Sequence, residues 1–269
     1  MGRCQQNFYG ASMSSQSIEP IIGTTLFANV ANAPNPAHVI PAPSATFDFP
    51  KPLTEKFRPT RINEFIGLDK IKRILDAFSR RPSVSAWVFC GPPGTGKTTM
   101  AQALCVAIGG EFHHLPSGKC TASAIDELVR MCWYAPMNGG FHVCLVDEAD
   151  RMTEGAQLAL LSKLDSTAAP PQTIWIFTCN SCDGLEKRFL SRCRVLEFSN
   201  YGMKQELAAL LATVWAAETN PTNSTNPASP TNPTNPEATS LPDFNRIAKD
   251  STNNVRQALM RLEIELLAQ

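Results

Sequence analysis

Residues 91–98, GPPGTGKT, have the types and spacing of a loop that binds a phosphate chain. The stretch fits Gly-x-x-x-x-Gly-Lys-Ser/Thr between an apolar run and a helical run, which makes a chance glycine turn the weaker interpretation. Its glycines let backbone N–H groups turn inward around phosphate oxygens. Lys97 would reach the β- and γ-phosphates, and the Thr98 hydroxyl would hold Mg²⁺. The loop residues expected at the ligand are Gly91, Pro92, Pro93, Gly94, Thr95, Gly96, Lys97, Thr98 and Thr99.

Polar residues at the ends of two other apolar runs complement this loop. Asp147 follows VCLV, where a carboxylate can orient the magnesium shell, and Glu148 is free to polarise an attacking water. Asn180 ends TIWIFTCN and would face the crevice beyond the strand ends, where its amide could position that water. The alternative is that the acids are solvated loop residues and that Asn180 caps the turn NSCDG.

The elements that must position these residues alternate between strand and helix. Short apolar runs predict buried strands at 86–90, 141–150, 173–180 and 194–198, and helical periodicity predicts helices at 98–108, 123–134 and 153–165. Such alternation is typical of an α/β fold, a parallel sheet with helices on both faces. Ser123 and Asp126 are placed like a capping pair for the second helix.

The remaining sequence predicts three further regions around this α/β domain, which spans 51–199. Residues 1–50 are rich in proline and poor in charge, which indicates a flexible arm. Residues 200–269 have helical periodicity throughout and predict a small helical domain, with Ser251 or Thr252 capping its last helix. An Asn-Pro-rich insertion at 219–240 interrupts that domain and predicts a solvated loop.

Composition excludes some classes of protein. The formal net charge is +0, so binding to nucleic acid would need a local patch. No run approaches the ~18 apolar residues of a membrane span, and no signal peptide is recognisable, so we expect an intracellular protein. Cys179, Cys182 and Cys193 lack the second close pair of ligands that zinc sites usually show, which disfavours a metal site there.

The successive motifs resemble those of one family. They are EKFRPTRINEFIGLDKIKRIL (55–75), GPPGTGKTT, VDEADRMTEGAQLALLSKLD, TCN, LSRC and NNVRQALMRLE. In this order, over about 52–269, they are similar to AAA+ ATPases of the clamp-loader branch, the replication factor C small subunits and their bacterial and archaeal relatives. The resemblance implies a P-loop NTPase domain followed by an all-helical lid, with ATP and Mg²⁺ as cofactors. It also implies Mg-dependent hydrolysis of ATP to ADP and phosphate.

The resemblance also assigns roles to individual residues. It implies that Arg58, Pro59, Ile66 and Gly67 line the adenine pocket, and that Asn180 is the first sensor of the γ-phosphate. Arg256 matches the second sensor, which links the lid to that phosphate; the alternative is a surface arginine. In LSRC, Arg192 matches an arginine finger that enters the ATP site of a neighbouring subunit. Arg188 is the reserve candidate.

The implied function is remodelling of DNA or of a DNA-bound sliding clamp by an oligomer of AAA+ subunits in a ring or arc. KIKR (70–73) and SRR (79–81) are candidate DNA contacts, although a solvated helix face also explains them. The alternatives are a branch-migration or helicase-like motor and an ATP-binding regulatory adaptor whose turnover needs partners. The expected location is the cytoplasm, at the nucleoid, or the nucleus of a eukaryote.

Overall fold

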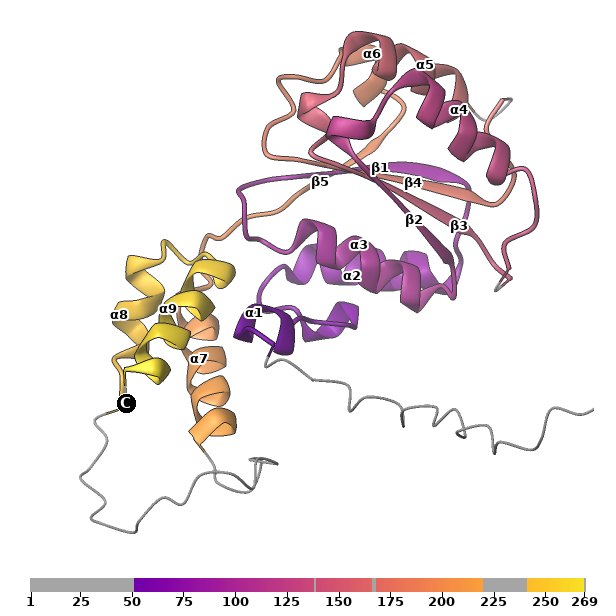
Figure 1. Ribbon diagram of the computed structural model, residues 1–269. Coiled ribbons are helices and arrows are strands. Elements are labelled where there is room, and N and C mark those ends of the chain that lie inside the picture. Colours follow the sequence, from indigo (N-terminus) through magenta and orange to yellow (C-terminus); the bar gives the residue numbers. More distant parts are fainter. Residues whose placement is uncertain (1–50, 138, 166–167, 220–240, 269) are drawn as a thin grey trace, which may run out of the picture. The chain divides into compact units, whose positions relative to one another are not determined.

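A computed structural model describes residues 51–268 of the chain, apart from 138, 166–167 and 220–240 (Figure 1). The predicted arm at 1–50 lies outside the described residues. So does the predicted Asn-Pro loop, except for Thr219.

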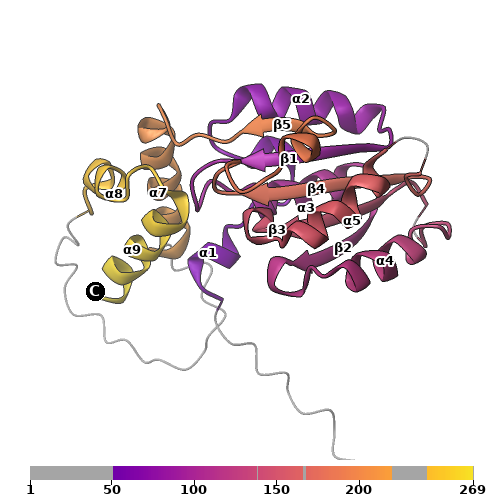
Figure 2. The ribbon, with the colours of Figure 1, turned by 90° about the horizontal axis from the view of Figure 1, so that it is seen from above.

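Five parallel strands form one sheet in the order β2-β3-β4-β1-β5 (Figure 2). The strands are β1 (Ser85–Cys90), β2 (Glu111–Pro116), β3 (His142–Asp147), β4 (Thr173–Cys179) and β5 (Arg194–Glu197). The predicted parallel sheet is confirmed, but the sequence did not predict β2, because EFHHLP is half-buried and rich in histidine. The prediction that β5 is buried is wrong: β5 lies at the edge of the sheet, and Leu196 is its one buried residue.

Helices cover both faces of this sheet (Figure 1). On one face lie α2 (Asp69–Arg80) and α3 (Lys97–Ala107), and on the other lie α4 (Ala122–Met131), α5 (Glu154–Leu164) and α6 (Lys187–Leu190). Successive strand residues enter opposite cores: Phe89, Leu145 and Ile176 pack with α2 and α3, whereas Val88, Val146 and Phe177 pack with α4 and α5. Burial on both faces explains why these strands are continuous apolar runs.

The capping of α4 differs from the prediction. The helix begins at Ala122, so Ser123 lies inside its first turn. Thr121 is the N-cap, and its hydroxyl oxygen accepts a hydrogen bond from the backbone N–H of Ala124 at 3.2 Å. The prediction of a capping pair at Ser123 and Asp126 is therefore wrong by two residues.

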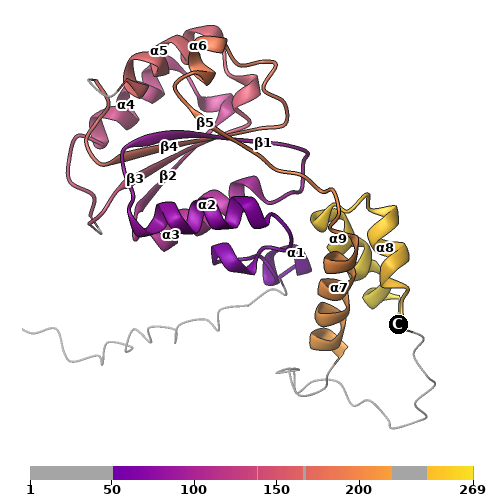
Figure 3. The ribbon, with the colours of Figure 1, turned by 180° about the vertical axis from the view of Figure 1, so that it is seen from behind.

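The C-terminal part of the chain is helical, as predicted. It contains α7 (Lys204–Thr219), α8 (Phe244–Asp250) and α9 (Val255–Leu267), and their apolar faces share one core. Leu53 of α1 (Leu53–Lys56) joins that core, so a residue from far upstream completes it. The helix α1 lies next to α9 (Figure 3). Asn254 caps α9, not Ser251 or Thr252, because Ser251 ends α8.

Candidate nucleotide site

The carboxyl ends of β1, β3 and β4 lie side by side in the sheet, and the predicted catalytic residues follow them directly. The phosphate-binding loop follows β1, and Gly91 is fixed to β4 because its N–H donates to the carbonyl of Cys179 at 3.2 Å. Asp147 is the last residue of β3, and Asn180 comes immediately after β4. Strand order thus brings together residues that are far apart in sequence.

The loop adopts a backbone that requires glycine. Gly94 has φ +77° and Gly96 has φ +86°, both in the left-handed region. A β-carbon at position 94 would also overlap the side-chain amide of Asn254. The loop then leads into the N-terminus of α3, where free N–H groups and the helix dipole favour an anion.

Lys97 is held at the centre of this arrangement. Its ammonium group donates to the carbonyls of Gly91 at 2.7 Å and Pro92 at 2.9 Å, and to the side-chain oxygen of Asn180 at 3.2 Å. Burial lowers the pKa of Lys97, and the neighbouring Cys179, Cys90 and Asp147 act in the opposite direction. A buried cation that neutral dipoles hold is suited to a phosphate group.

Replacing Lys97 by Met should lower ATP affinity at least about tenfold, because a charge-assisted hydrogen bond to phosphate is lost. The nucleotide-free variant should melt at the same temperature or higher, since the lowered pKa of Lys97 means that folding disfavours its charge at neutral pH. Nucleotide titration and thermal unfolding measure the two effects. Lys204→Met, at an exposed lysine, is the control. Unchanged affinity in Lys97→Met would contradict the assigned role.

Thr98 and Asp147 form an oxygen-donor pair beside Lys97. The Thr98 hydroxyl donates to Oδ1 of Asp147 at 3.0 Å, and the Thr178 hydroxyl donates to the same carboxylate. A carboxylate with a hydroxyl next to it suits Mg²⁺, which prefers oxygen ligands. Sequence reasoning missed Thr178, although its place in the run TCN, directly before the strand end, could have indicated it.

Glu148 follows Asp147 in a left-handed conformation, with φ +52°. Its backbone N–H donates to the Thr178 hydroxyl at 3.2 Å, which fixes the turn. The carboxylate is half-exposed and forms an ion pair with Arg151 at 3.1 Å. A non-glycine residue held at positive φ next to a metal-type donor pair is the kind of strained position that functional sites retain.

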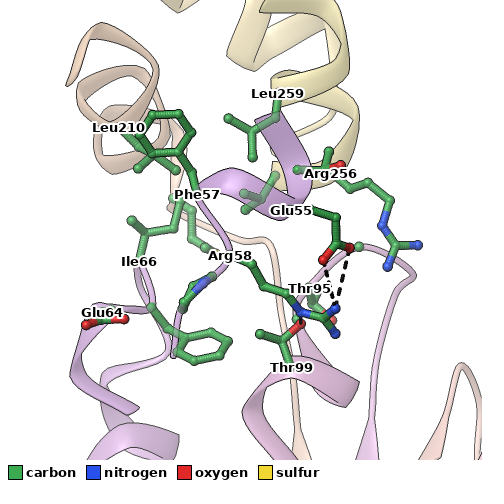
Figure 4. A pocket seen from close by; sticks show the side chains of 17 residues that line it. Glu55, Phe57, Arg58, Glu64, Ile66, Thr95, Thr99, Leu210, Arg256 and Leu259 are labelled. Atoms are coloured by element: carbon green, nitrogen blue, oxygen red, sulfur yellow. Dashed lines mark hydrogen bonds and ion pairs between the residues drawn. The ribbon is translucent and has the colours of Figure 1, made fainter. Parts of the chain in front are cut away.

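A pocket lies between residues 54–66, the phosphate-binding loop and the helices α7 and α9 (Figure 4). Arg58, Pro59, Ile66 and Arg256 all line it, together with Gly94, Thr95, Gly96 and Thr99. Gly67 lies in a separate hollow beside Met203 and Glu206, and its N–H donates to the Glu206 carboxylate. Apolar walls from Phe57, Leu210 and Leu259, with Arg58 bonded to Thr99 at 3.2 Å, suit a planar base beside the phosphates.

Comparison with known proteins agrees with this geometry. Residues 87–201 match the AAA family, the ATPase family associated with various cellular activities. The replication factor C small subunit 1 of Pyrobaculum arsenaticum is 35% identical over 153 residues, which are 54% of this chain and 46% of that protein. The small subunit of Methanothermobacter thermautotrophicus is 30% identical, with 55% and 47% covered. Residues 87–201 of this chain thus match the AAA family, and about half of the chain is similar to replication factor C small subunits.

Solved structures show the same fold. The Thermotoga maritima RuvB Holliday junction branch migration motor has a TM-score of 0.59 at 20% identity, with 77% of this chain and 64% of that chain covered. A variant of the same RuvB protein has a TM-score of 0.60 at the same identity and coverage. The chain spans about half the length of the curated relatives it matches. Among the described residues, no helix is long and apolar enough to span a bilayer.

Asn254 tethers the helical part to the phosphate-binding loop of the α/β domain. Its side-chain N–H donates to the carbonyl of Pro93 at 2.9 Å, while its side-chain oxygen accepts from the N–H of Gln257 at 3.2 Å. Sequence reasoning missed this residue, although an asparagine directly before a helical run is itself a capping signal. Asn254 therefore joins the loop and the start of α9 through one amide.

Asn254→Ala should lower the free energy of unfolding by about 1 kcal/mol through loss of the cap, and should also weaken ATP binding. Asn254→Asp keeps a capping oxygen but cannot donate to Pro93, so its stability should stay near wild type while its ATP affinity still falls. Denaturant unfolding and nucleotide titration separate the two effects, with Gln257→Ala as the control. Full ATP affinity in Asn254→Asp would contradict the role of the tether.

Arg192 lies between α6 and β5 of the α/β domain. Its guanidinium donates to the Asp165 carboxylate at 2.6 Å and to the Arg188 carbonyl at 2.9 Å. The Arg192 hydrogen bond lowers the pKa of Asp165. These partners are at the end of α5 and in α6, so the bonds described for Arg192 do not reach Lys97 or Asp147. Arg188 is more exposed and pairs with Glu186 at 3.7 Å.

Three thiols gather beside the phosphate-binding loop. Cys179 and Cys182 have their sulfur atoms 3.9 Å apart, and Cys90 completes a group with the spacing of metal ligands. Cys193, which the sequence associated with Cys179 and Cys182, is not in this group. Burial raises the pKa of Cys182 to about 11, so this thiol stays protonated at neutral pH.

Proposed function

We propose that this chain is a Mg-dependent ATPase of the clamp-loader type. The observation that carries the proposal is the convergence of Lys97, bonded to Asn180 at 3.2 Å, and Thr98, bonded to Asp147 at 3.0 Å, at the adjoining carboxyl ends of β1, β3 and β4. Lysines and acids with a purely structural role would not be expected to converge in this way at adjoining strand ends.

The proposed roles follow from each residue's contacts. The loop and Lys97 bind the phosphates. Arg58, Ile66 and Arg256 position the adenine base and the helical lid around those phosphates. Asn180 orients the attacking water, and Glu148 accepts its proton. Thr98 and Asp147 would hold Mg²⁺, which when bound neutralises phosphate charge. Water attack on the γ-phosphate breaks its bond to the bridging oxygen and yields ADP and phosphate.

We further propose that the chain acts with other AAA+ subunits in a ring or arc, with Arg192 completing a neighbour's site. The similarity to replication factor C small subunits supports this, as does the bonding of Arg192 to Asp165, at the end of α5, among the described residues. DNA and a sliding clamp are the proposed targets. Exposed cations of α2 and the residue after it, Lys70, Arg73, Arg80 and Arg81, are the proposed backbone contacts. The proposed location is the cytoplasm, at the nucleoid, or a eukaryotic nucleus.

The test is ATP hydrolysis per chain as a function of protein concentration, with and without primed DNA. We expect activity that rises with self-association and with DNA, and that falls as salt screens the backbone contacts. A variant with Lys70 and Arg73 changed to Glu should lose the DNA response and keep the basal rate. Activity that is flat in concentration would contradict the oligomer. Unwinding of duplex DNA would indicate the motor, and ATP binding without turnover would indicate the adaptor.

A further inference from the structure

A second group of ligand-type side chains lies at the amino ends of β2 and β3, the opposite end of these strands from Asp147. Glu111 begins β2 and His142 begins β3, and the two residues are Cα partners in the sheet. His113 lies two residues along β2 and therefore faces the same side as Glu111. Cys132, which ends α4, packs against this side of the sheet.

The donor atoms of this group converge. Nε2 of His113 lies 3.0 Å from Nδ1 of His142, and the donor atoms of His113, Cys132 and His142 all lie within 4.8 Å of one another. Two nitrogens bound to one tetrahedral zinc ion at ~2.0 Å would be about 3.3 Å apart. The observed nitrogen separation is therefore close to the one that a shared ion requires.

Burial makes the convergence unusual. His142 is 3% exposed and Cys132 is fully buried. Histidine and cysteine can pack in a core as hydrogen-bonded groups, and Sγ of Cys132 lies 3.5 Å from Sγ of Cys144. Three donor atoms within 4.8 Å of one another also have the spacing of ligands to one ion.

His142 is already oriented as a metal ligand would be. Its Nε2 lies 2.9 Å from the carbonyl of Tyr134, so this nitrogen carries the hydrogen and donates it. Nδ1 is then left with a lone pair directed at His113. Metal-binding histidines commonly donate their other ring N–H to a backbone carbonyl in this way, which fixes the tautomer.

Glu111 lies beside the two imidazoles, where it would supply a fourth donor to an ion and balance its charge. Its carboxylate oxygens lie 3.8 Å from Nε2 of His113 and 3.9 Å from Nδ1 of His142. The N–H of Met137 donates to the same carboxylate at 2.8 Å and orients it. A carboxylate, a thiolate and two neutral imidazoles would leave no net charge around a divalent ion, which suits a buried position.

We propose that Glu111, His113, Cys132 and His142 bind one Zn²⁺ ion in a closed, structural site. Zinc accepts nitrogen, sulfur and oxygen donors in tetrahedral geometry. The Cys132 thiol gives up its proton to solvent as the zinc–sulfur bond forms, so no oxidant or reductant is needed. The ion would join β2, β3 and the residue directly after α4, and would thereby hold the edge strand β2 to β3, the strand that ends in Asp147.

The experiment uses the full chain, stripped with a chelator and titrated with Zn²⁺ or Co²⁺. We expect one tightly bound zinc per chain, a higher melting temperature with zinc, and a Co²⁺ spectrum with tetrahedral d–d bands and a thiolate charge-transfer band. His113→Gln should lower the zinc affinity more than about 100-fold, beyond the effect of losing an outer-sphere partner. Glu111→Gln should weaken binding less and keep the thiolate band.

Two control variants test whether the ion binds at the proposed site and not at a neighbouring one. His114→Gln alters the neighbouring histidine, which faces the other side of β2, and should keep the zinc. Cys182→Ser alters the thiol group beside the phosphate-binding loop and should also keep it. Loss of the Co²⁺ spectrum in Cys182→Ser, or its persistence in His113→Gln, would overturn the proposal. So would a stripped wild-type chain that takes up no zinc. Circular dichroism of zinc-free His113→Gln checks that the variant is folded.

Discussion

Replacing Arg192 by Ala should reduce ATP hydrolysis by the assembled protein about 10³- to 10⁵-fold while each chain keeps its affinity for ATP. The reason is that the guanidinium would neutralise charge that develops on the transferred phosphoryl group of a neighbouring chain, and not charge in its own site. Hydrolysis rates at a concentration above self-association, with nucleotide titration alongside, measure both quantities.

Asp165→Asn is the matched control, because Asp165 holds Arg192 in this structure. If Arg192 only secures the end of α5, the two variants should lose activity together. If it acts as a finger, Asp165→Asn keeps the guanidinium and most of the activity. Arg188→Ala tests the reserve candidate in the same assay.

A mixing experiment tests whether Arg192 of one chain acts on the ATP site of a neighbouring chain. A chain with Arg192→Ala has an intact site and no finger, and a chain with Lys97→Met has a finger and a defective site. Mixing them should restore part of the hydrolysis, since some interfaces then combine an intact site with an intact finger. A mixture no more active than the sum of its parts would exclude action between chains.

The second large effect is expected at Glu148. Glu148→Gln keeps the size and hydrogen-bonding capacity of the side chain but removes its basicity, so hydrolysis should fall about 10²- to 10⁴-fold while ATP still binds. Slow hydrolysis with a nucleotide retained on the protein is the result to measure. Single-turnover kinetics would show that the chemical step, not product release, is affected.

Arg151→Ala is the matched control for Glu148, because the two side chains form an ion pair at 3.1 Å. The pair is exposed and contributes little to stability. Arg151→Ala should therefore stay active. If it loses as much activity as Glu148→Gln, the ion pair and not the base would explain the effect.

The residues of the proposed phosphate-binding loop could be located from sequence because the motif depends on local spacing. One stretch of eight residues contains the glycines, Lys97 and Thr98, and a continuous apolar run places Asp147 at a strand end. The parallel sheet also followed, since strands buried on both faces leave an unambiguous pattern.

The features that sequence reasoning missed depend on contacts between distant segments. The strand β2 escaped notice because its half-buried, polar sequence has neither the apolar run of a central strand nor a clean alternation. Local patterns could have indicated Thr178 and Asn254 as residues of interest. Their hydrogen bonds to Asp147 and Pro93, however, join segments that are distant in sequence, and spacing does not predict such bonds. The donors of the proposed zinc site are distributed over β2, α4 and β3, and only strand pairing brings them together.

The amide of Asn254 couples the start of α9 to the phosphate-binding loop, so a change in the loop can change the tilt of the helix. The helix has 13 residues and is therefore about 20 Å long, and Asn254 lies at its end next to the phosphate-binding loop. A tilt of about 10° at that end would displace the far end of the helix by roughly 3 Å, from the helix length alone. A rotation of that size would be measurable at Leu267, which is exposed. A reporter group placed there would read the state of a loop it never touches.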